Sequence, residues 1–273
     1  ARSWADPLCE GPWPSTDRGS VRPMRARYLA ERFDLSFMAT LDDLARDDDV
    51  LAEAADEDEV VLWFEHDLFD QAILVWLLHE LAPIARGVRL SLVQVDSHPS
   101  VARFIGLGQL APGALAELFH ARVAVTDAML ERAHAAVAAW TADDPERLHL
   151  LRAPDAALPH LGPAVERYLR EYPALGCGLA LTERWALEAV RDGAPDAAGI
   201  GAVVQEREAR PWLGDRMLFS RLRQLAEGVA PVLELDGEVM GPAGGGVRVT
   251  LTALGARVLS GAADWLLLQQ QER

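Results

Sequence analysis

Acidic and histidine side chains follow directly after two apolar runs of the sequence, Val60–Phe64 and Val88–Val95. These polar residues are Glu65, His66, Asp67, Asp96 and His98. Histidine titrates near neutral pH, so an imidazole that a carboxylate holds in place can act as a general acid or base. We therefore predict His66 and His98 as acid–base groups, with Glu65, Asp67 and Asp96 as the carboxylates that orient them.

The same residues offer a second chemistry, the binding of a divalent metal ion. Imidazole nitrogens and carboxylate oxygens together form mixed coordination sites. Asp96 and His98 would supply two ligands, and Asp67 or Glu65 would supply a third. A divalent metal is therefore the cofactor that this pattern suggests.

Part of the pattern has a purely structural interpretation. Asp67 can cap the helix that follows it, while Asp70 and Gln71 occupy first-turn positions that favour acidic or amide side chains. Asp96 and His98 can shape the turn after their strand. Capping accounts for the first three residues, but it does not also explain Glu65, His66, Asp96 and His98. We favour a functional cluster, in which Asp70 and Gln71 are ligand-binding groups.

Residues near the N-terminus add candidates for ligand binding. Asp6 and Glu10 accompany an expected short strand, Ser3–Leu8, and three arginines follow the next loop. These arginines are Arg22, Arg25 and Arg27. Arginine binds carboxylates and phosphates in a bidentate manner, which predicts a small anionic ligand such as a phosphorylated molecule. The chain begins without Met or an apolar leader, like the middle of a strand, so we expect an upstream segment to be missing.

Apolar periodicity predicts the elements that position these groups. Val60–Phe64 and Val88–Val95 are typical of parallel strands buried on both faces, and Leu68–Leu81 is the crossover helix between them. Such a βαβ unit brings the carboxyl ends of both strands to one edge. We therefore predict an α/β fold, with a Rossmann-like parallel sheet domain in residues 1–110 and a helical segment packed on it in residues 111–175.

Residues 176–273 show a separate pattern: three helices, two short strands joined by a Gly-rich turn, and a closing helix. This is the order of a winged helix, an α+β unit that binds DNA or other proteins. If it binds DNA, the helix Met217–Glu227 is the recognition element. Its DNA-contacting candidates are Arg216, Arg221, Arg223 and Gln224. The net charge of −16 repels phosphate backbones and disfavours this partner.

Six segments, in order along nearly the whole chain, form a recognisable set. They are Trp63–Gln71, Phe104–Leu110, Leu158–Leu161, Gly178–Arg184, Leu213–Asp215 and Leu251–Gly255. In them the chain resembles a bacterial family that carries the domain of unknown function numbered 1835. The resemblance implies that a strand and a Gly-Asp-Ser turn precede the present N-terminus, and that the C-terminal helical extension belongs to the family. It implies no activity and lends no catalytic residues.

Composition and missing motifs narrow the class of protein. Half of the residues are hydrophobic, which is typical of a globular protein, but no run reaches the ~20 apolar residues of a membrane span. Cys9 and Cys177 form neither a disulfide framework nor a zinc-binding pair, which indicates the cytoplasm. Walker, GxGxxG, HExxH and GxSxG motifs are absent. The remaining histidines are interpreted as surface or packing residues: His79, His120, His134, His149 and His160.

We therefore expect a cytoplasmic enzyme, such as a hydrolase, or a binding protein for a small anionic ligand at the carboxyl ends of the strands. A ligand-responsive winged-helix transcription regulator is the first alternative. A non-catalytic protein-interaction module is the second.

Overall fold

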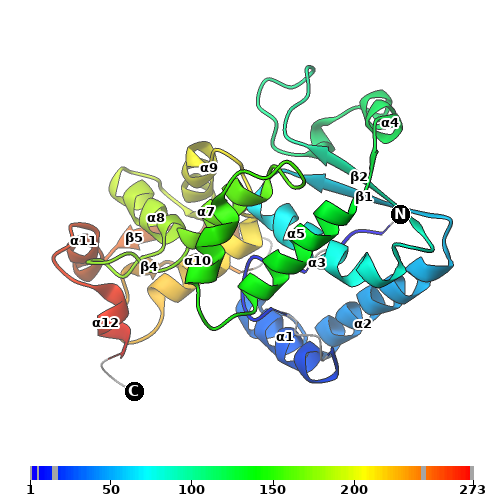
Figure 1. Ribbon diagram of the computed structural model, residues 1–273. Coiled ribbons are helices and arrows are strands. Elements are labelled where there is room, and N and C mark those ends of the chain that lie inside the picture. The colour runs from blue at the N-terminus through cyan, green and yellow to red at the C-terminus, as the bar shows by residue number, and fades with distance from the viewer. Residues whose placement is uncertain (1, 5, 14–17, 241–243, 271–273) are drawn as a thin grey trace. The chain divides into compact units, whose positions relative to one another are not determined.

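The computed structural model has an α/β fold in two compact units (Figure 1). The first unit comprises Ala1–Glu31 and Leu35–Arg167, and the second comprises Arg32–Asp34 and Tyr168–Arg273. The helices between residues 111 and 167 therefore belong to the same unit as the larger sheet. The structure describes residues 2–4, 6–13, 18–240 and 244–270.

A pair of parallel strands forms the centre of the first unit. Strand β1 (Glu59–Glu65) and strand β2 (Arg89–Val95) pair along their whole length, from Glu59 opposite Arg89 to Glu65 opposite Val95. Helix α3 (Leu68–Leu81) is the crossover between them. The predicted neighbouring parallel strands are thus confirmed. Their carboxyl ends, and the polar residues that follow, lie at the same edge of the sheet.

The third strand departs from the predicted parallel sheet. Strand β3 (Val123–Ala124) pairs antiparallel with β2, in the order β1-β2-β3. It has only two residues, both exposed, and so lacks the continuous apolar run of a strand buried between two layers. The sheet is therefore mixed, and the parallel prediction was wrong for this strand.

The predicted strand Ser3–Leu8 is not formed by the described residues 2–4 and 6–8. The segment turns instead: the N–H of Leu8 donates to the carbonyl of Asp6, and the N–H of Glu10 donates to the carbonyl of Pro7. Pro7 has no N–H to give to a strand ladder, and its ring fixes a backbone angle that suits turns. The sheet edge therefore receives polar residues from two strands rather than three.

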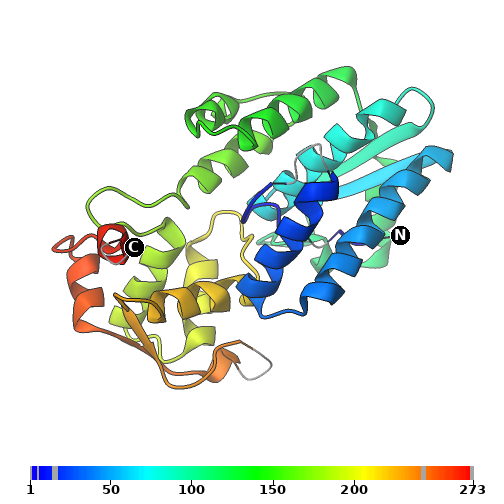
Figure 2. The ribbon, with the colours of Figure 1, turned by 90° about the horizontal axis from the view of Figure 1, so that it is seen from below.

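Helices surround the strand pair. Helix α3 is buried around most of its circumference and packs against α5 (Asp127–Trp140), as Figures 1 and 2 show. This explains why its sequence is apolar on nearly every face. The other helices of the unit are α1 (Arg18–Phe33), α2 (Phe37–Glu53), α4 (Pro112–His120), α6 (Glu146–His149) and α7 (Leu161–Leu169), the last of which runs into the second unit.

The second unit contains helices and a two-stranded sheet in the predicted order. The elements are α8 (Leu181–Arg191), α9 (Ala197–Arg207), α10 (Asp215–Ala226), β4 (Leu233–Leu235), β5 (Val249–Leu251), α11 (Ala253–Leu259) and α12 (Trp265–Gln270). Strands β4 and β5 are antiparallel. The helices bury Leu187, Ile200 and Leu222 in a common apolar core. Among the described residues, no helix combines the length and apolar character that crossing a membrane requires.

Candidate functional site

Three carboxylates gather where β1 ends and α3 begins. Ligand oxygens of Glu65, Asp67 and Asp70 all lie within 4.8 Å of one another. Within the described ranges, they form the one group of three or more potential metal-ligating side chains that meets this distance. We call these three residues the carboxylate cluster. Sequence reasoning placed all three at this strand end, and the structure brings them together.

Backbone N–H groups hold each carboxylate in place. Asp67 caps α3 by accepting the N–H of Asp70 at 3.1 Å, and Asp70 Oδ2 accepts the N–H of Glu65. Glu65 Oε1 accepts the N–H of Leu107 at 2.6 Å. A Cβ atom added at Gly106 would lie 2.8 Å from Glu65 Oε2, so the loop approaches this carboxylate closely because residue 106 has no side chain. The cluster is therefore positioned by both neighbouring elements.

Burial and mutual repulsion oppose the charges of the cluster. Loss of solvent, followed by the nearby charge of Asp70, raises the pKa of Asp67 to about 8. Burial is also the largest cause that raises the pKa of Glu65 and that of Asp70. Asp67 is buried and Glu65 and Asp70 are partly buried, and carboxylates this close together with little solvent favour taking up protons or binding a cation. The cluster thus has the charge and the ligand atoms of a cation site.

Gln71 has a structural role. It is fully buried, its Nε2 donates to the carbonyl of Glu65 at 2.6 Å, and its Oε1 accepts from Gln94 Nε2 at 3.1 Å. The side chain thereby links the ends of β1 and β2. Because both of its polar atoms are used inside the fold, we no longer assign Gln71 to ligand binding.

A second group of polar residues lies beside the same strand ends. The buried ring of His66 lies 6.1 Å from that of His160, at 73°, and 6.0 Å from the ring of Phe104. Asp96 interacts electrostatically with both imidazole rings. Its pKa is lowered first by the hydroxyl of Ser97 and further by the charges of His160 and His66. We call His66 and His160 the imidazole pair.

His160 was missed by sequence reasoning, which interpreted it as a surface or packing residue. It directly precedes α7, almost a hundred residues after His66. The available signal was its place in Leu158–Leu161, one of the six segments that carry the family resemblance. No spacing rule joins two histidines so far apart in sequence.

His98, the expected partner of His66, belongs to a local turn. Its Nδ1 lies 2.7 Å from Ser100 Oγ and accepts the N–H of Ser100 at 3.2 Å, and the backbone forms a bridge between His98 and Val101. Pro99 enforces a turn at this point, since it cannot extend the strand. Among the described groups that meet the metal-ligand distance, the predicted set of Asp96, His98 and Asp67 is not found.

The N-terminal arginines do not form the predicted anion clamp. Arg25 is 1% exposed and binds the carboxylate of Asp6 through Nε at 2.9 Å and through Nη2 at 2.5 Å. Its remaining donors contact the carbonyls of Pro7, Glu10 and Pro12. A charge this deeply buried needs such partners to offset the loss of water. Arg25, Asp6 and the buried Glu10 therefore hold the N-terminal loop together.

The other two arginines of this group are nearer the surface. Arg22 forms an ion pair with Asp48, and Arg27 is exposed. Neither is placed by the structure in the carboxylate cluster or the imidazole pair.

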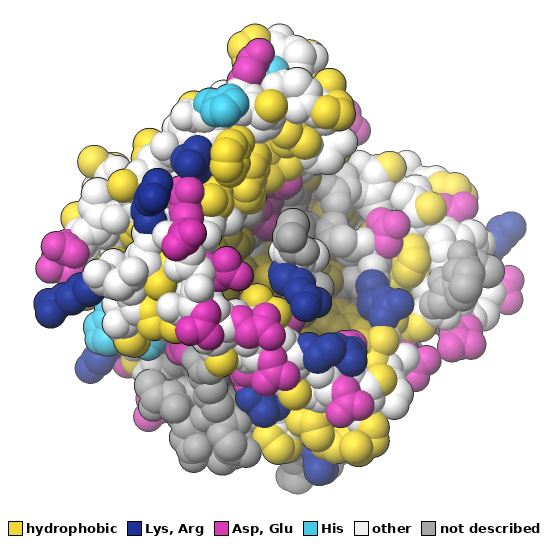
Figure 3. All heavy atoms as spheres, turned by 90° about the vertical axis from the view of Figure 1, so that its right-hand side faces the viewer, with side chains coloured by type: hydrophobic (Ala, Val, Ile, Leu, Met, Phe, Trp, Pro, Cys, Tyr) yellow, Lys and Arg dark blue, Asp and Glu magenta, His cyan; other side chains and the backbone are white. Residues whose placement is uncertain are grey.

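A cavity of about 830 Å³ gives access to the carboxylate cluster. It runs along β1 and reaches Glu65, Asp70 and Leu107 at one end. Helix α2 contributes Asp47, whose pKa burial raises to about 6 with help from the charge of Asp6. Figure 3 looks onto the side where the N-terminus lies in Figure 1 and shows hydrophobic surface among acidic and basic side chains. We call the cavity of about 830 Å³ along β1 the β1 cavity.

The proposed DNA-contacting residues of α10 are partly engaged. Arg221 is buried and pairs with Glu171, with 2.6 Å between Nη1 and Oε2. Arg223 donates to the carbonyl of Arg32, which belongs to the same unit, at 3.0 Å. Arg216 and Gln224 remain exposed. Arg221 and Arg223 therefore serve the fold of this unit.

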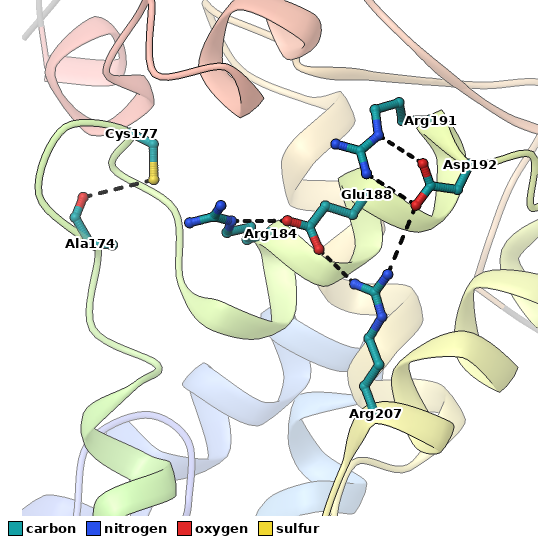
Figure 4. A network of polar contacts seen from close by, with 7 residues as sticks. All are labelled: Ala174, Cys177, Arg184, Glu188, Arg191, Asp192 and Arg207. Atoms are coloured by element: carbon teal, nitrogen blue, oxygen red, sulfur yellow. Dashed lines mark hydrogen bonds and ion pairs between the residues drawn. The ribbon is translucent and has the colours of Figure 1, made fainter.

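Basic side chains on α8 and α9 are neutralised by acidic neighbours. Arg184 and Arg207 both bind Glu188, at 3.0 and 2.6 Å. Arg191 pairs with Asp192 at 2.8 Å, and Arg207 also lies 4.0 Å from Asp192, so that the five side chains form one network (Figure 4). A face on which each arginine is matched by a carboxylate offers little net attraction for a phosphate backbone.

Comparisons with known proteins found no matching family model, no similar curated protein and no similar solved structure. The function must therefore be argued from the geometry of the site.

Proposed function

We propose that the protein binds a divalent cation at the carboxylate cluster and uses it, together with the imidazole pair, to act on a small anionic ligand. The observation that carries the proposal is the convergence of Glu65, Asp67 and Asp70 within 4.8 Å at the carboxyl end of a parallel strand. Ligands of open α/β sheets bind at this edge. The parallel β1–α3–β2 arrangement therefore supports a Rossmann-like interpretation of the site.

Oxygen chemistry selects the kind of cation. Three carboxylates favour hard ions such as Mg²⁺, Mn²⁺ or Ca²⁺ over ions that prefer nitrogen or sulfur. The backbone hydrogen bonds to the cluster use Oε1 of Glu65 and Oδ2 of Asp70, so the second oxygen of each of these carboxylates could bind a cation. A bound cation would also compensate the charges whose burial raises the pKa of Asp67 to about 8.

The cation would take over the role that the sequence assigned to arginine. Arg25 is committed to Asp6, so an anionic ligand group has no clamp there. A divalent ion on the cluster would attract and polarise a phosphate or carboxylate oxygen of the ligand. This keeps an anionic small molecule as the ligand class.

The imidazole pair supports proton transfer beside the cation. His66 and His160 are close enough for a ligand atom to contact both, and the carboxylate of Asp96 interacts electrostatically with both rings. Metal-assisted hydrolysis is the reaction class that best uses a cation and a neighbouring acid–base group. We assign Asp96 as a positioning residue.

A winged-helix DNA regulator is the weaker candidate. The element order of the second unit supports it, but Arg221 and Arg223 are bound within the fold and the arginines of α8 and α9 are paired. The net charge of −16 also disfavours DNA binding, because it repels the phosphate backbone.

Titration of the metal-free protein with Mn²⁺, followed by electron paramagnetic resonance, tests the proposal. We expect one site per chain in the wild type and at least tenfold weaker binding in D70N. The matched control is D196N. Asp196 also lies at a helix N-terminus, where it caps α9 by accepting the N–H of Gly199 at 2.8 Å, but it is outside the cluster. Equal Mn²⁺ affinity in D70N and D196N would reject the cation site.

A further inference from the structure

Two histidines outside the proposed site face one another across the interface of α3 and α5. The Nδ1 atoms of His79 and His134 are 2.9 Å apart, with ring centroids at 4.7 Å and an angle of 31° between the rings. His79 lies in the last turn of α3, whereas Asp67 caps its first turn. At 1.5 Å per residue, the twelve residues between them place the histidines roughly 18 Å along the helix from the carboxylate cluster.

The spacing of the two nitrogens is that of two ligands on one metal ion. Metal–imidazole bonds are about 2.0–2.1 Å long, so two nitrogens at right angles around one ion, as in square-planar Cu²⁺ or Ni²⁺ sites, lie roughly 2.9 Å apart. The wider angle of tetrahedral zinc would place them roughly 3.3 Å apart. Two imidazoles that both present Nδ1 to the same point must share either a proton or a cation. The observed distance between His79 and His134 fits both, and metal binding requires a small rotation of the rings.

The surroundings favour a cation here. The C-terminal end of α3 carries the negative end of the helix dipole, which attracts positive charge. His134 is exposed and His79 is half-buried, so water can complete the coordination.

We propose that His79 and His134 form a two-histidine site for a nitrogen-preferring transition-metal ion, of the class of Zn²⁺, Ni²⁺ or Cu²⁺. The ion would link the end of α3 to α5. No third His, Cys, Asp or Glu among the described residues lies within 4.8 Å of both ligand atoms, so the site is open to water or to a further ligand. It differs from the carboxylate cluster in ligand chemistry, and each site can therefore be tested without the other.

Tryptophan fluorescence reports on this site. The ring of Trp76 lies 6.2 Å from that of His79, close enough for a bound Cu²⁺ ion to quench its emission. We expect Cu²⁺ to quench the wild type in a saturable manner with one equivalent. H134A should weaken this quenching at least tenfold, and H79A should do the same while circular dichroism confirms that both variants fold.

H120A is the matched control, because His120 is also in the last turn of a helix, α4, and is exposed. It should retain the affinity of the wild type. The same Cu²⁺ affinity in H134A, H79A and H120A would overturn the proposal and indicate binding to single surface histidines. Failure of Mn²⁺ to bind at the carboxylate cluster would leave this result unaffected.

Discussion

Replacing Asp67 with Asn separates its charge from its role as a helix cap. Asn caps helices about as well as Asp, so D67N should keep the hydrogen bond to the N–H of Asp70 and the start of α3. It removes a carboxylate whose pKa is raised to about 8 by burial and by the charge of Asp70. The variant should therefore change stability at a pH where Asp67 ionises in the unfolded chain, and change it little where Asp67 is protonated in both the folded and the unfolded chain.

The sign follows from proton linkage. A carboxylate with a folded-state pKa of about 8 and an ordinary value of 3.8 binds its proton more tightly in the folded protein. Its contribution to stability is therefore present below about pH 4 and is lost as the pH rises towards 8. At about 1.4 kcal/mol for each tenfold change in proton affinity, the full difference is on the order of 5 kcal/mol. Relaxation of the buried site around the charge reduces it, and we expect about 2–3 kcal/mol at pH 9.

Urea unfolding in the presence of a chelator measures this difference. At pH 3.5 we expect wild type and D67N to agree within about 0.5 kcal/mol, because the side chain at position 67 is then mostly neutral in both the folded and the unfolded chain. At pH 9 the variant should be more stable by the amount given above. D196N, which alters the cap of α9 instead, should show no such gain. A D67N protein that is less stable than wild type at pH 9 would refute the assignment of a strained, buried charge.

Three further predictions concern other parts of the first unit. Gly106→Ala should push the new Cβ against Glu65 and weaken Mn²⁺ binding at least tenfold, whereas Gly108→Ala, where a Cβ meets nothing within 4 Å, should leave it unchanged; isothermal titration calorimetry compares the two. Arg25→Met should lower the free energy of unfolding by about 3–5 kcal/mol in urea, since it leaves a buried carboxylate without its partner. Because the pKa of His79 is lowered in the folded protein, the stabilising contribution of its neutral ring is lost as the pH falls below 6.5. The melting temperature of H79Q should therefore depend less on pH between 7.5 and 5.5 than that of the wild type, as measured by thermal scans. An unchanged slope would contradict this.

The parallel strands and the carboxylate cluster could be predicted because their signals are local. Val60–Phe64 is a continuous apolar run of the kind that is buried on both faces, and Asp67 follows it at a helix start. The expected carboxylates Glu65 and Asp70 lie within five residues of each other. Residues so close along the chain must also be close in space.

The rest of the site depends on contacts between distant segments. His160 meets His66 because α7 returns to the strand ends, and no periodicity in either segment contains that information. The ion pair of Arg25 with Asp6 misled the prediction for a different reason. An arginine near a loop looks the same in sequence whether it binds a ligand or a buried carboxylate, and only its burial distinguishes the two.

Anomalous diffraction from crystals grown with Mn²⁺ tests the cation site most directly. The cation proposal predicts a manganese peak in contact with oxygens of Glu65, Asp67 and Asp70, at the end of the β1 cavity. Crystals in which these three carboxylates contact one another through protons, with manganese bound elsewhere or not at all, would contradict it.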